Sequence, residues 1–437
     1  MVSLATDSAR VRLLVSFALV SLHACAIGAE RPLPDPLQLS DVTTIALRDR
    51  GEVAAAYARA EALAQRPAIV GALEDPMVSP SIDHYPFDMM EPENEMGEPV
   101  GDNGRRYDWS ISVEQRFPLS GVRGHRRTAA RADAQRAKAM AASTGLDVVL
   151  EAQRNFFMLL ERRLMLRVFE EQLALAQQFV SVSSSRYSSG VGAQSEVLRA
   201  EVEVARVQAA QQALVAEIRA AEAMLNASLG RTSHDPIPEL THAASRAAPL
   251  AAPVVLERAL MRRPELVAGA AEVDRATAEI EVMRSMYKPM ATVRVGRATT
   301  MAEGPGAMIM LGISLPIWRD SLRAGVAEAR AMQRMANADL EAMRRMVEGE
   351  AIAALENVNA ARTQATVLES EVAPRARAAA ESALSSYASG QGTLVAVIES
   401  ARAWWEVQAE QVMADAALGE AWARLERSIG ATQESTP

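Results

Sequence analysis

The chain has 437 residues, of which 49% are hydrophobic but only 4% aromatic, and its formal net charge is −9. An acidic chain with only two lysines, Lys138 and Lys288, excludes a broad polyanion-binding surface, so we expect no nucleic-acid partner. Abundant Ala, Val and Leu with few aromatic residues argues against several compact domains of mixed structure and favours long helices packed closely side by side.

Residues 1–25 have the features of a secretory signal peptide. Arg10 and Arg12 precede an apolar run, residues 13–22, which is too short to span a membrane and is followed by small residues. The only cysteine, Cys25, ends the sequence Leu-His-Ala-Cys, which resembles the lipobox of bacterial lipoproteins. Two outcomes stay open: Cys25 carries a lipid that adds membrane affinity, or it is lost with the signal peptide.

A first structural unit is predicted for residues 37–235. It starts with a helix from Ser40, a favoured N-cap residue, to about Gln65, and Pro67 should end this helix. A hairpin of two strands and a pair of long helices follow. The strands are expected at about 77–85 and 107–118, where apolar and polar residues alternate, and the helices at about 122–187 and 194–229.

A linker, residues 236–253, separates this unit from a second unit, residues 254–430, with the same order of elements. Its strands are expected at about 289–298 and 307–316, with a short turn around residues 303–306, and its helices at about 320–387 and 393–429. Pro374 lies inside the first of these helices, where we expect a kink. Residues 431–437 form a short polar tail, which we expect to be disordered.

The two units are copies of each other. The turn Tyr187–Gly192 aligns with Tyr387–Gly392 at an offset of 200 residues. Near the start of each unit, Arg50–Val53 aligns with Arg263–Leu266 at an offset of 213. A duplicated sequence predicts two units with the same fold.

The predicted fold class is mainly α with a small β part. A helix of about 66 residues is roughly 100 Å long, which no compact domain of this size needs. Strands of about ten residues with aromatic side chains near their ends are typical of outer-membrane barrels. Four strands cannot close such a barrel, because the smallest need about eight, and open strand edges are not tolerated in lipid. Either the strands form a soluble sheet or several copies share one barrel.

Several motifs, in order and partly duplicated, resemble those of TolC-type outer-membrane efflux factors, from about Ser40 to Gly430. They are Gln115–Gly121, Arg186-Tyr187 with Gly190, Val197–Glu201, Leu225–Arg231 and Arg263–Leu266. The resemblance implies a homotrimer that builds one α-helical barrel through the periplasm and one shared 12-stranded β-barrel in outer-membrane lipid of a Gram-negative cell. It also implies two partners, a periplasmic adaptor protein and an inner-membrane efflux pump, and no cofactor.

The resemblance places both glycine turns at the periplasmic tip. The implied tip and gate residues are Gly190, Gly390, Glu196, Tyr387 and Glu399. The implied adaptor contacts are Arg186, Tyr187, Ser189, Gly190, Ser389 and Gly390. Two positions depart from the family's pattern, because Gly392 stands where a gating arginine is expected and Ala396 where an acid is expected. Glu196 and Glu399 have an alternative interpretation as solvated carboxylates near a helix start, where the helix dipole favours them.

Methionines in or beside the hairpins indicate a substrate class. Thioethers suit soft monovalent metal ions, and the steps Asp75-Pro76 and Phe117-Pro118 resemble the heavy-metal branch of the family. Methionine also fills irregular apolar space, so export of organic compounds or of several drugs is the alternative. The methionines concerned are Met89, Met90, Met96, Met301, Met308 and Met310.

Two other classes compete with a channel. An enzyme is not predicted, because the sequence has no helical pair of histidines, no phosphate-binding glycine loop followed by lysine and no nucleophile elbow. No resident metal site is predicted either. A periplasmic coiled-coil adaptor should have one helical hairpin flanked by β-rich domains, without a duplicated strand hairpin.

Overall fold

The computed structural model describes residues 32–83, 107–241, 247–300 and 304–431. The expected signal peptide, Cys25, the loop with Met89, Met90 and Met96, Met301 and the expected tail from residue 432 lie outside these described residues. The chain divides into residues 1–33 and a unit from Pro34 onward, and the description below concerns the second of these.

The first repeat has a broken helix before its strands. Its elements are β1 (Leu37–Gln38), α1 (Leu39–Asp49), α2 (Gly51–Gly71), β2 (Met77–Asp83), β3 (Asp108–Pro118), α3 (Val122–Ser188) and α4 (Gln194–Ser228). Where we expected one helix ending before Pro67, the chain breaks at Arg50, whose backbone is extended, and Pro67 lies inside α2. Proline removes only one hydrogen bond from this helix, and packing of α2 along α3 holds the helix together to Gly71.

The second repeat follows the same order with one difference, a π-helix within its first long helix. Its elements are β4 (Leu240–Thr241), α5 (Ala252–Arg262), α6 (Pro264–Ser285), β5 (Met290–Thr300), β6 (Gly304–Ser314), α7 (Arg319–Val367), the π-helix η1 (Leu368–Val372), α8 (Ala373–Ala388) and α9 (Leu394–Ser428). Helix α5 overlaps the expected linker. The expected helix over 320–387 is interrupted by η1, because Pro374 has no N–H to donate to the carbonyl four positions earlier and a wider turn absorbs the mismatch.

The four long strands form one antiparallel sheet in the order β2-β3-β5-β6. The register places Val113, Val295 and Ile309 side by side on one face, and all three are exposed. The opposite face carries Ser112 and Glu114, which are buried. The second hairpin is tighter than expected, because Gly304 pairs with Thr300 and residues 304–306 belong to β6. The sheet therefore carries exposed apolar side chains on one face and polar side chains, among them the buried Ser112 and Glu114, on the other.

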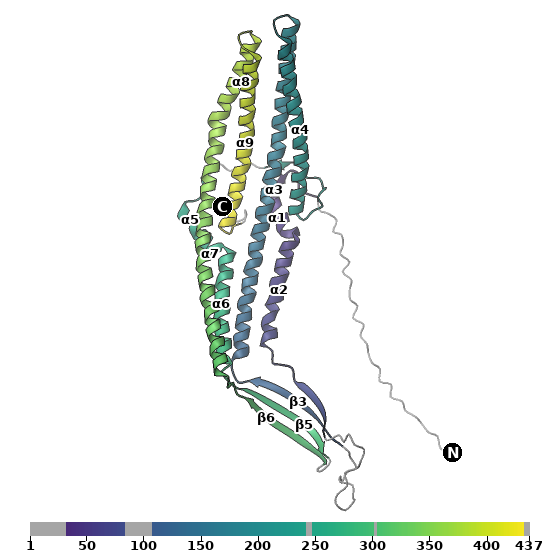
Figure 1. Ribbon diagram of the computed structural model, residues 1–437, viewed down its shortest axis with the longest axis vertical. Coiled ribbons are helices and arrows are strands. Elements are labelled where there is room, and N and C mark those ends of the chain that lie inside the picture. Colours follow the sequence, from purple (N-terminus) through teal and green to yellow (C-terminus); the bar gives the residue numbers. More distant parts are fainter. Residues whose placement is uncertain (1–31, 84–106, 242–246, 301–303, 432–437) are drawn as a thin grey trace, which may run out of the picture. The chain divides into compact units, whose positions relative to one another are not determined.

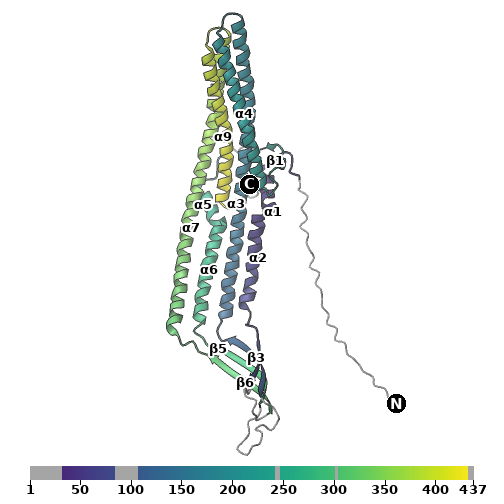
Figure 2. The ribbon, with the colours of Figure 1, turned by 45° about the vertical axis from the view of Figure 1, so that its right-hand side comes forward.

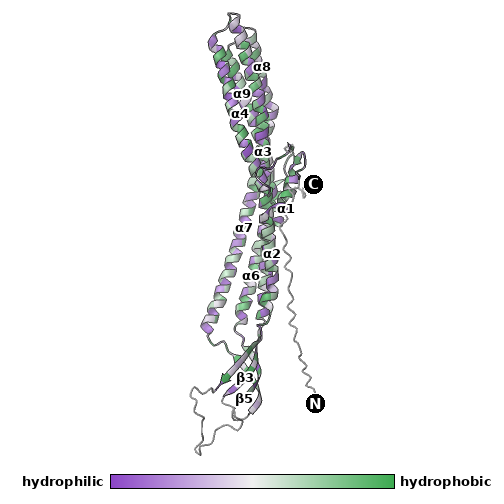
Figure 3. Ribbon diagram, turned by 90° about the vertical axis from the view of Figure 1, so that its right-hand side faces the viewer, coloured by the Kyte–Doolittle hydropathy of each residue, from purple (hydrophilic) through white to green (hydrophobic). Residues whose placement is uncertain are grey.

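The helices run between this sheet and two glycine turns (Figures 1 and 2). Helices α2 and α6 pack along α3, α4 returns against α3, and α9 packs against α3, α7 and α8. Figure 3 shows hydrophobic and hydrophilic residues interleaved along these helices. Among the described residues, no helix combines the length and the hydropathy that a membrane span requires. The small side chains of the sequence, such as Ala176, Ala200 and Ala401, lie buried at helix contacts.

Candidate gate at the helical tip

Both glycine turns have the same backbone geometry. Gly190 and Gly390 have φ values of 76° and 79°, in the left-handed region that favours glycine. In each turn a backbone N–H after this glycine returns to the end of the preceding helix, from Gly192 to the Arg186 carbonyl at 2.9 Å and from Gly392 to the Ser386 carbonyl at 3.0 Å. The turns end α3 and α8 and start α4 and α9, so they make two equivalent helical hairpins.

Tyr387 joins these two hairpins. Its side chain is only 1% exposed, although it lies next to the turn. The Tyr387 hydroxyl donates to Glu196 Oε2 at 3.1 Å, and Arg186 Nη1 donates to the Tyr387 carbonyl at 3.1 Å. The Arg186 guanidinium carbon lies 4.7 Å from the centre of the Tyr387 ring, within range of a cation–π interaction. Burial, followed by the Glu196 carboxylate, raises the pKa of Tyr387, so the hydroxyl stays protonated as a donor.

A second contact joins the hairpins further along the same helices. Glu203 of α4 is 6% exposed. Its carboxylate accepts from Arg402 Nε of α9 at 3.1 Å and, through the other oxygen, from Arg402 Nη2. Arg206, one turn along α4, donates to Glu203 at 3.3 Å. We call Arg186, Glu196, Glu203, Tyr387 and Arg402 the tip latch.

The sequence did not identify Glu203 and Arg402. One signal was available, because Glu203 lies between Ala200 and Val207 on a helix face that is otherwise buried. A carboxylate on such a face needs a cationic partner. Nothing in the sequence indicates that this partner is 199 positions away.

An apolar cluster surrounds the tip latch. It contains Ala176 and Phe179 of α3, Ala200 and Val207 of α4, and Leu394, Val397, Ala401 and Trp405 of α9. The rings of Phe179 and Trp405 stack with centres 6.4 Å apart. The two hairpins therefore share a core as well as polar contacts.

The other residues singled out from the sequence lie on the outside of the tip. Tyr187 is 49% exposed, and Ser189, Gly190, Ser389 and Gly390 are exposed at the turns. Glu399 is also exposed, and within the described part of the chain it has no hydrogen-bond or ion-pair partner, so the structure does not bring it to Tyr387 and Glu196. 

Gly392, where the family pattern has an arginine, lies close to the end of the preceding helix. A Cβ atom on Gly392 would lie 3.1 Å from the Tyr387 backbone nitrogen and 3.3 Å from the Ser386 carbonyl carbon. A side chain there would push against the turn. Arg186 of the first repeat supplies a guanidinium to Tyr387 in this chain.

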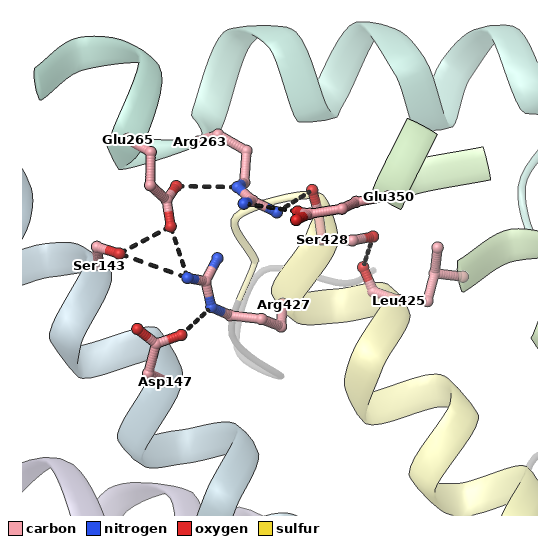
Figure 4. Close-up of polar contacts among 8 residues, drawn as sticks. All are labelled: Ser143, Asp147, Arg263, Glu265, Glu350, Leu425, Arg427 and Ser428. Carbon is pink, nitrogen blue, oxygen red and sulfur yellow. Dashed lines mark hydrogen bonds and ion pairs between the residues drawn. The ribbon is translucent and has the colours of Figure 1, made fainter. Parts of the chain in front are cut away.

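A separate ionic network lies where α3, α6, α7 and α9 meet (Figure 4). Glu265 accepts from Ser143 Oγ at 2.7 Å, from Arg427 Nη2 at 2.5 Å and from Arg263 Nε at 2.9 Å. Arg427 also donates to Asp147 at 2.7 Å. Burial alone would raise the pKa of Glu265, but hydrogen bonds from Ser143, from the backbone N–H of Glu265 and from Arg427, together with the Arg427 charge, outweigh it and lower the pKa to about 2.

The duplicated Arg-x-Glu motif accounts for part of this network. Arg263 donates to the Ser428 carbonyl at the end of α9 and to Glu350 of α7. In the first repeat Arg50 donates to the Ala227 carbonyl at the end of α4 at 3.3 Å and to Glu151 of α3 at 3.0 Å. Each arginine links the start of one helix to the end of another by hydrogen bonds, so the motif stabilises the fold.

No resident metal centre is found in the part of the chain that the structure describes, since it holds no group of three or more His, Cys, Asp or Glu side chains placed to bind an ion. The polar residues at the tip are paired with each other across the two hairpins. Tyr387, Glu196, Glu203 and Arg402 therefore join the two hairpins of one chain through side-chain contacts.

Comparison with known proteins gives consistent matches along the chain. The profile of a protein family described as "Outer membrane efflux protein" matches residues 46–231 and 255–431. The chain is 25% identical over 294 residues to the cobalt-zinc-cadmium resistance protein CzcC of Cupriavidus metallidurans, covering 66% of this chain and 69% of that protein.

Solved structures share the fold. The outer-membrane channel OprN superposes with a TM-score of 0.75 at 19% identity, covering 90% of both chains. A structure of CusC, described with the conformational changes that accompany transmembrane channel formation, superposes with a TM-score of 0.76 at 15% identity, covering 93% of this chain and 96% of that chain. At these identities the likeness concerns the fold alone.

Proposed function

The chain belongs to the outer membrane efflux protein family, and from this premise we propose that three copies of it form the exit duct of a tripartite efflux system. It is an outer-membrane efflux channel of the Gram-negative envelope with a periplasmic extension, and its family and fold are those of passive channels. The alternative of a periplasmic adaptor is therefore wrong. The proposed assembly has no catalytic step of its own and works with a periplasmic adaptor and an inner-membrane pump.

The sheet supports assembly of three copies. Strands β2 and β6 lie at its two edges and have no further strand partner within the described residues. Backbone groups in lipid must find hydrogen-bond partners. Pairing β6 of one copy with β2 of the next continues the antiparallel alternation, and three copies of four strands give a closed sheet of twelve. The position of β2 and β6 at the two edges of the sheet is the observation that carries the proposal.

The two faces of the sheet suit a pore. Ile309, Leu311 and Ile313 of β6 are 61–77% exposed on the apolar face, which would contact lipid. The polar face would line the pore, with Glu114 accepting from Arg294 Nε at 2.9 Å across neighbouring strands. Ser81 and Ser110 share a hydrogen bond of 2.8 Å on the same face. A charged lining of this kind suits hydrophilic cargo.

Heavy-metal cations are the substrate class that we propose. The relative CzcC is named for resistance to cobalt, zinc and cadmium. The register places Met308 and Met310 on the polar face, next to Gly296 and Arg294. Thioethers favour softer ions than cobalt or zinc, so the name of the relative and the methionines do not select the same metals. Export of organic compounds remains the second candidate.

At the tip, we propose that Glu196, Tyr387, Gly190 and Gly390 act in gating, and that Glu399 faces a neighbouring copy or the adaptor. The proposed adaptor contacts are Arg186, Tyr187, Ser189, Gly190, Ser389 and Gly390. Exposure of both turns supports this assignment, and only Arg186 also makes latch contacts. Lipidation of Cys25 is proposed separately, and mass spectrometry of the mature N-terminus tests it.

A deletion strain tests the function. Loss of the gene should raise sensitivity to the exported substrates, and the intact chain should restore resistance. Cobalt, zinc, cadmium, copper and silver salts are compared with organic dyes and detergents. Sensitivity to metals alone supports the metal proposal, sensitivity to organic compounds alone supports the second candidate, and no change in either contradicts a role in efflux.

A further inference from the structure

A cavity of about 470 Å³ lies between the two helical hairpins of one chain, and its lining comes from α3, α8 and α9. Phe179 of α3 and Trp405 of α9, whose rings stack, form part of this lining. Trp404 lines the cavity as well and is only partly buried. Three aromatic side chains therefore gather at one place in a chain that is only 4% aromatic.

The simplest alternative is that these aromatic residues only fill the contact between helices. The duplication of the chain argues against it, because the other copy of each position carries a small or aliphatic residue. At the offset of 200 residues, Phe179, Trp404 and Trp405 correspond to Ala379, Val204 and Ala205. The same kind of helical hairpin is therefore built without aromatic side chains at these positions, and the aromatic lining calls for another explanation.

The edge of the cavity carries an excess of negative charge. Glu381 accepts from Arg377 Nε at 2.8 Å, so these two charges offset each other. Glu171 accepts from the neutral amide of Gln408 at 3.1 Å, and within the described part of the chain it has no cationic partner. The lining thus combines aromatic faces with one uncompensated carboxylate.

We propose that this cavity is a binding site for an aromatic organic cation. Its volume lies within the range of about 300–1,000 Å³ that is usual for small-molecule sites. A planar cation is attracted to the face of an indole ring, which Trp404 offers, and its charge is complementary to Glu171. An anion of the same size would meet the Glu171 carboxylate at the edge and is disfavoured.

Occupancy of the cavity should favour the closed tip. Both hairpins contribute to the lining, so opening of the tip, which separates them in the proposed channel, would take the site apart. A ligand that binds only one of two states shifts the equilibrium toward that state. At ten times its dissociation constant, the ligand should raise the ratio of closed to open channels by about tenfold for each site. This consequence rests on the proposed function, whereas binding itself does not.

Titration calorimetry of the purified protein in lipid nanodiscs tests the site, with the planar cation ethidium as the probe. A ligand of this size in a half-open cavity should bind with a dissociation constant of roughly 10 μM. Trp404→Leu should weaken binding by about tenfold and Glu171→Gln by about fivefold, whereas Trp404→Phe should stay within about threefold of the parent. Glu406→Gln removes an exposed carboxylate of α9 outside the cavity and should leave binding unchanged. Fluorescein, an anionic dye of similar size, should not bind.

Planar-bilayer recording then tests the effect on the tip. Ethidium should lower the open probability of the parent and should leave that of Trp404→Leu unchanged at the same concentration. Absence of binding, or equal binding by the parent, Trp404→Leu and Glu171→Gln, would overturn the site. Binding that leaves the open probability of the parent unchanged would overturn its effect on the tip. A protein that binds ethidium at this site but forms no conducting channel would contradict the proposed function and support the site.

Discussion

Removal of one hydroxyl group should open the tip. In Tyr387→Phe the ring keeps its place in the apolar cluster, and only the 3.1 Å hydrogen bond to Glu196 is lost. A hydrogen bond to a charged group contributes about 1.5–3 kcal/mol, and partial exposure of Glu196 lowers this to about 1 kcal/mol. If three copies open together, the closed state loses about 3 kcal/mol, which is roughly a hundredfold in the ratio of open to closed channels.

Single-channel recording in planar bilayers measures this ratio directly. The matched control is Tyr187→Phe, because Tyr187 holds the equivalent position of the first repeat and is 49% exposed. Its open probability should equal that of the parent. Glu196→Ala together with Tyr387→Phe should raise conductance little beyond Tyr387→Phe alone, since both substitutions remove the same bond. An unchanged open probability in Tyr387→Phe, or an equal rise in Tyr187→Phe, would refute the reasoning.

Three further predictions concern stability and export. Glu265→Gln should lower the free energy of unfolding in urea by about 3 kcal/mol at pH 7, because the pKa of Glu265 is about 2. The control Glu52→Gln, on a side chain that is 62% exposed, should lower it by less than about 1 kcal/mol. The difference in stability between Glu265→Gln and the parent should vanish as pH falls toward 2. Burial raises the pKa of Glu426 to about 7, so the folded state binds more protons than the unfolded state. The free energy of unfolding should therefore fall by up to about 3 kcal/mol as pH rises from 4.5 to 8. Glu426→Gln should remove this pH dependence, and a pH dependence that persists in the variant would contradict the raised pKa of Glu426. Arg402→Gln should raise the open probability in planar bilayers by about tenfold or more, whereas Arg206→Gln, on an exposed side chain with a single bond to Glu203, should change it by less than about twofold.

The duplication and most element types could be predicted from the sequence because they depend on local signals. Period-two alternation around Val113, the left-handed glycines at 190 and 390, and the repeated Arg-x-Glu motif each identify a feature without tertiary information. The resemblance to a family assigned Tyr387 and Glu196 to the tip and gate without pairing them, and the structure brings the two residues together. Their part in gating stays a prediction.

Other features depend on packing that no local pattern contains. Pro67 favours a helix end, but α2 continues because it packs along α3. The π-helix before Pro374 arises from the loss of one donor inside a long helix, and a kink and a π-turn are alternative responses to that loss. The pair Glu203–Arg402 and the position of Arg186 over Tyr387 come from elements about 200 residues apart.

Electron cryomicroscopy of the full-length protein purified from outer membranes tests the central claim most directly. The account predicts particles of three chains in which β6 of each copy pairs with β2 of the next, closing one sheet of twelve strands beneath a shared helical duct. Particles of a single chain, with both sheet edges free or covered by the chain's own helices, would contradict it.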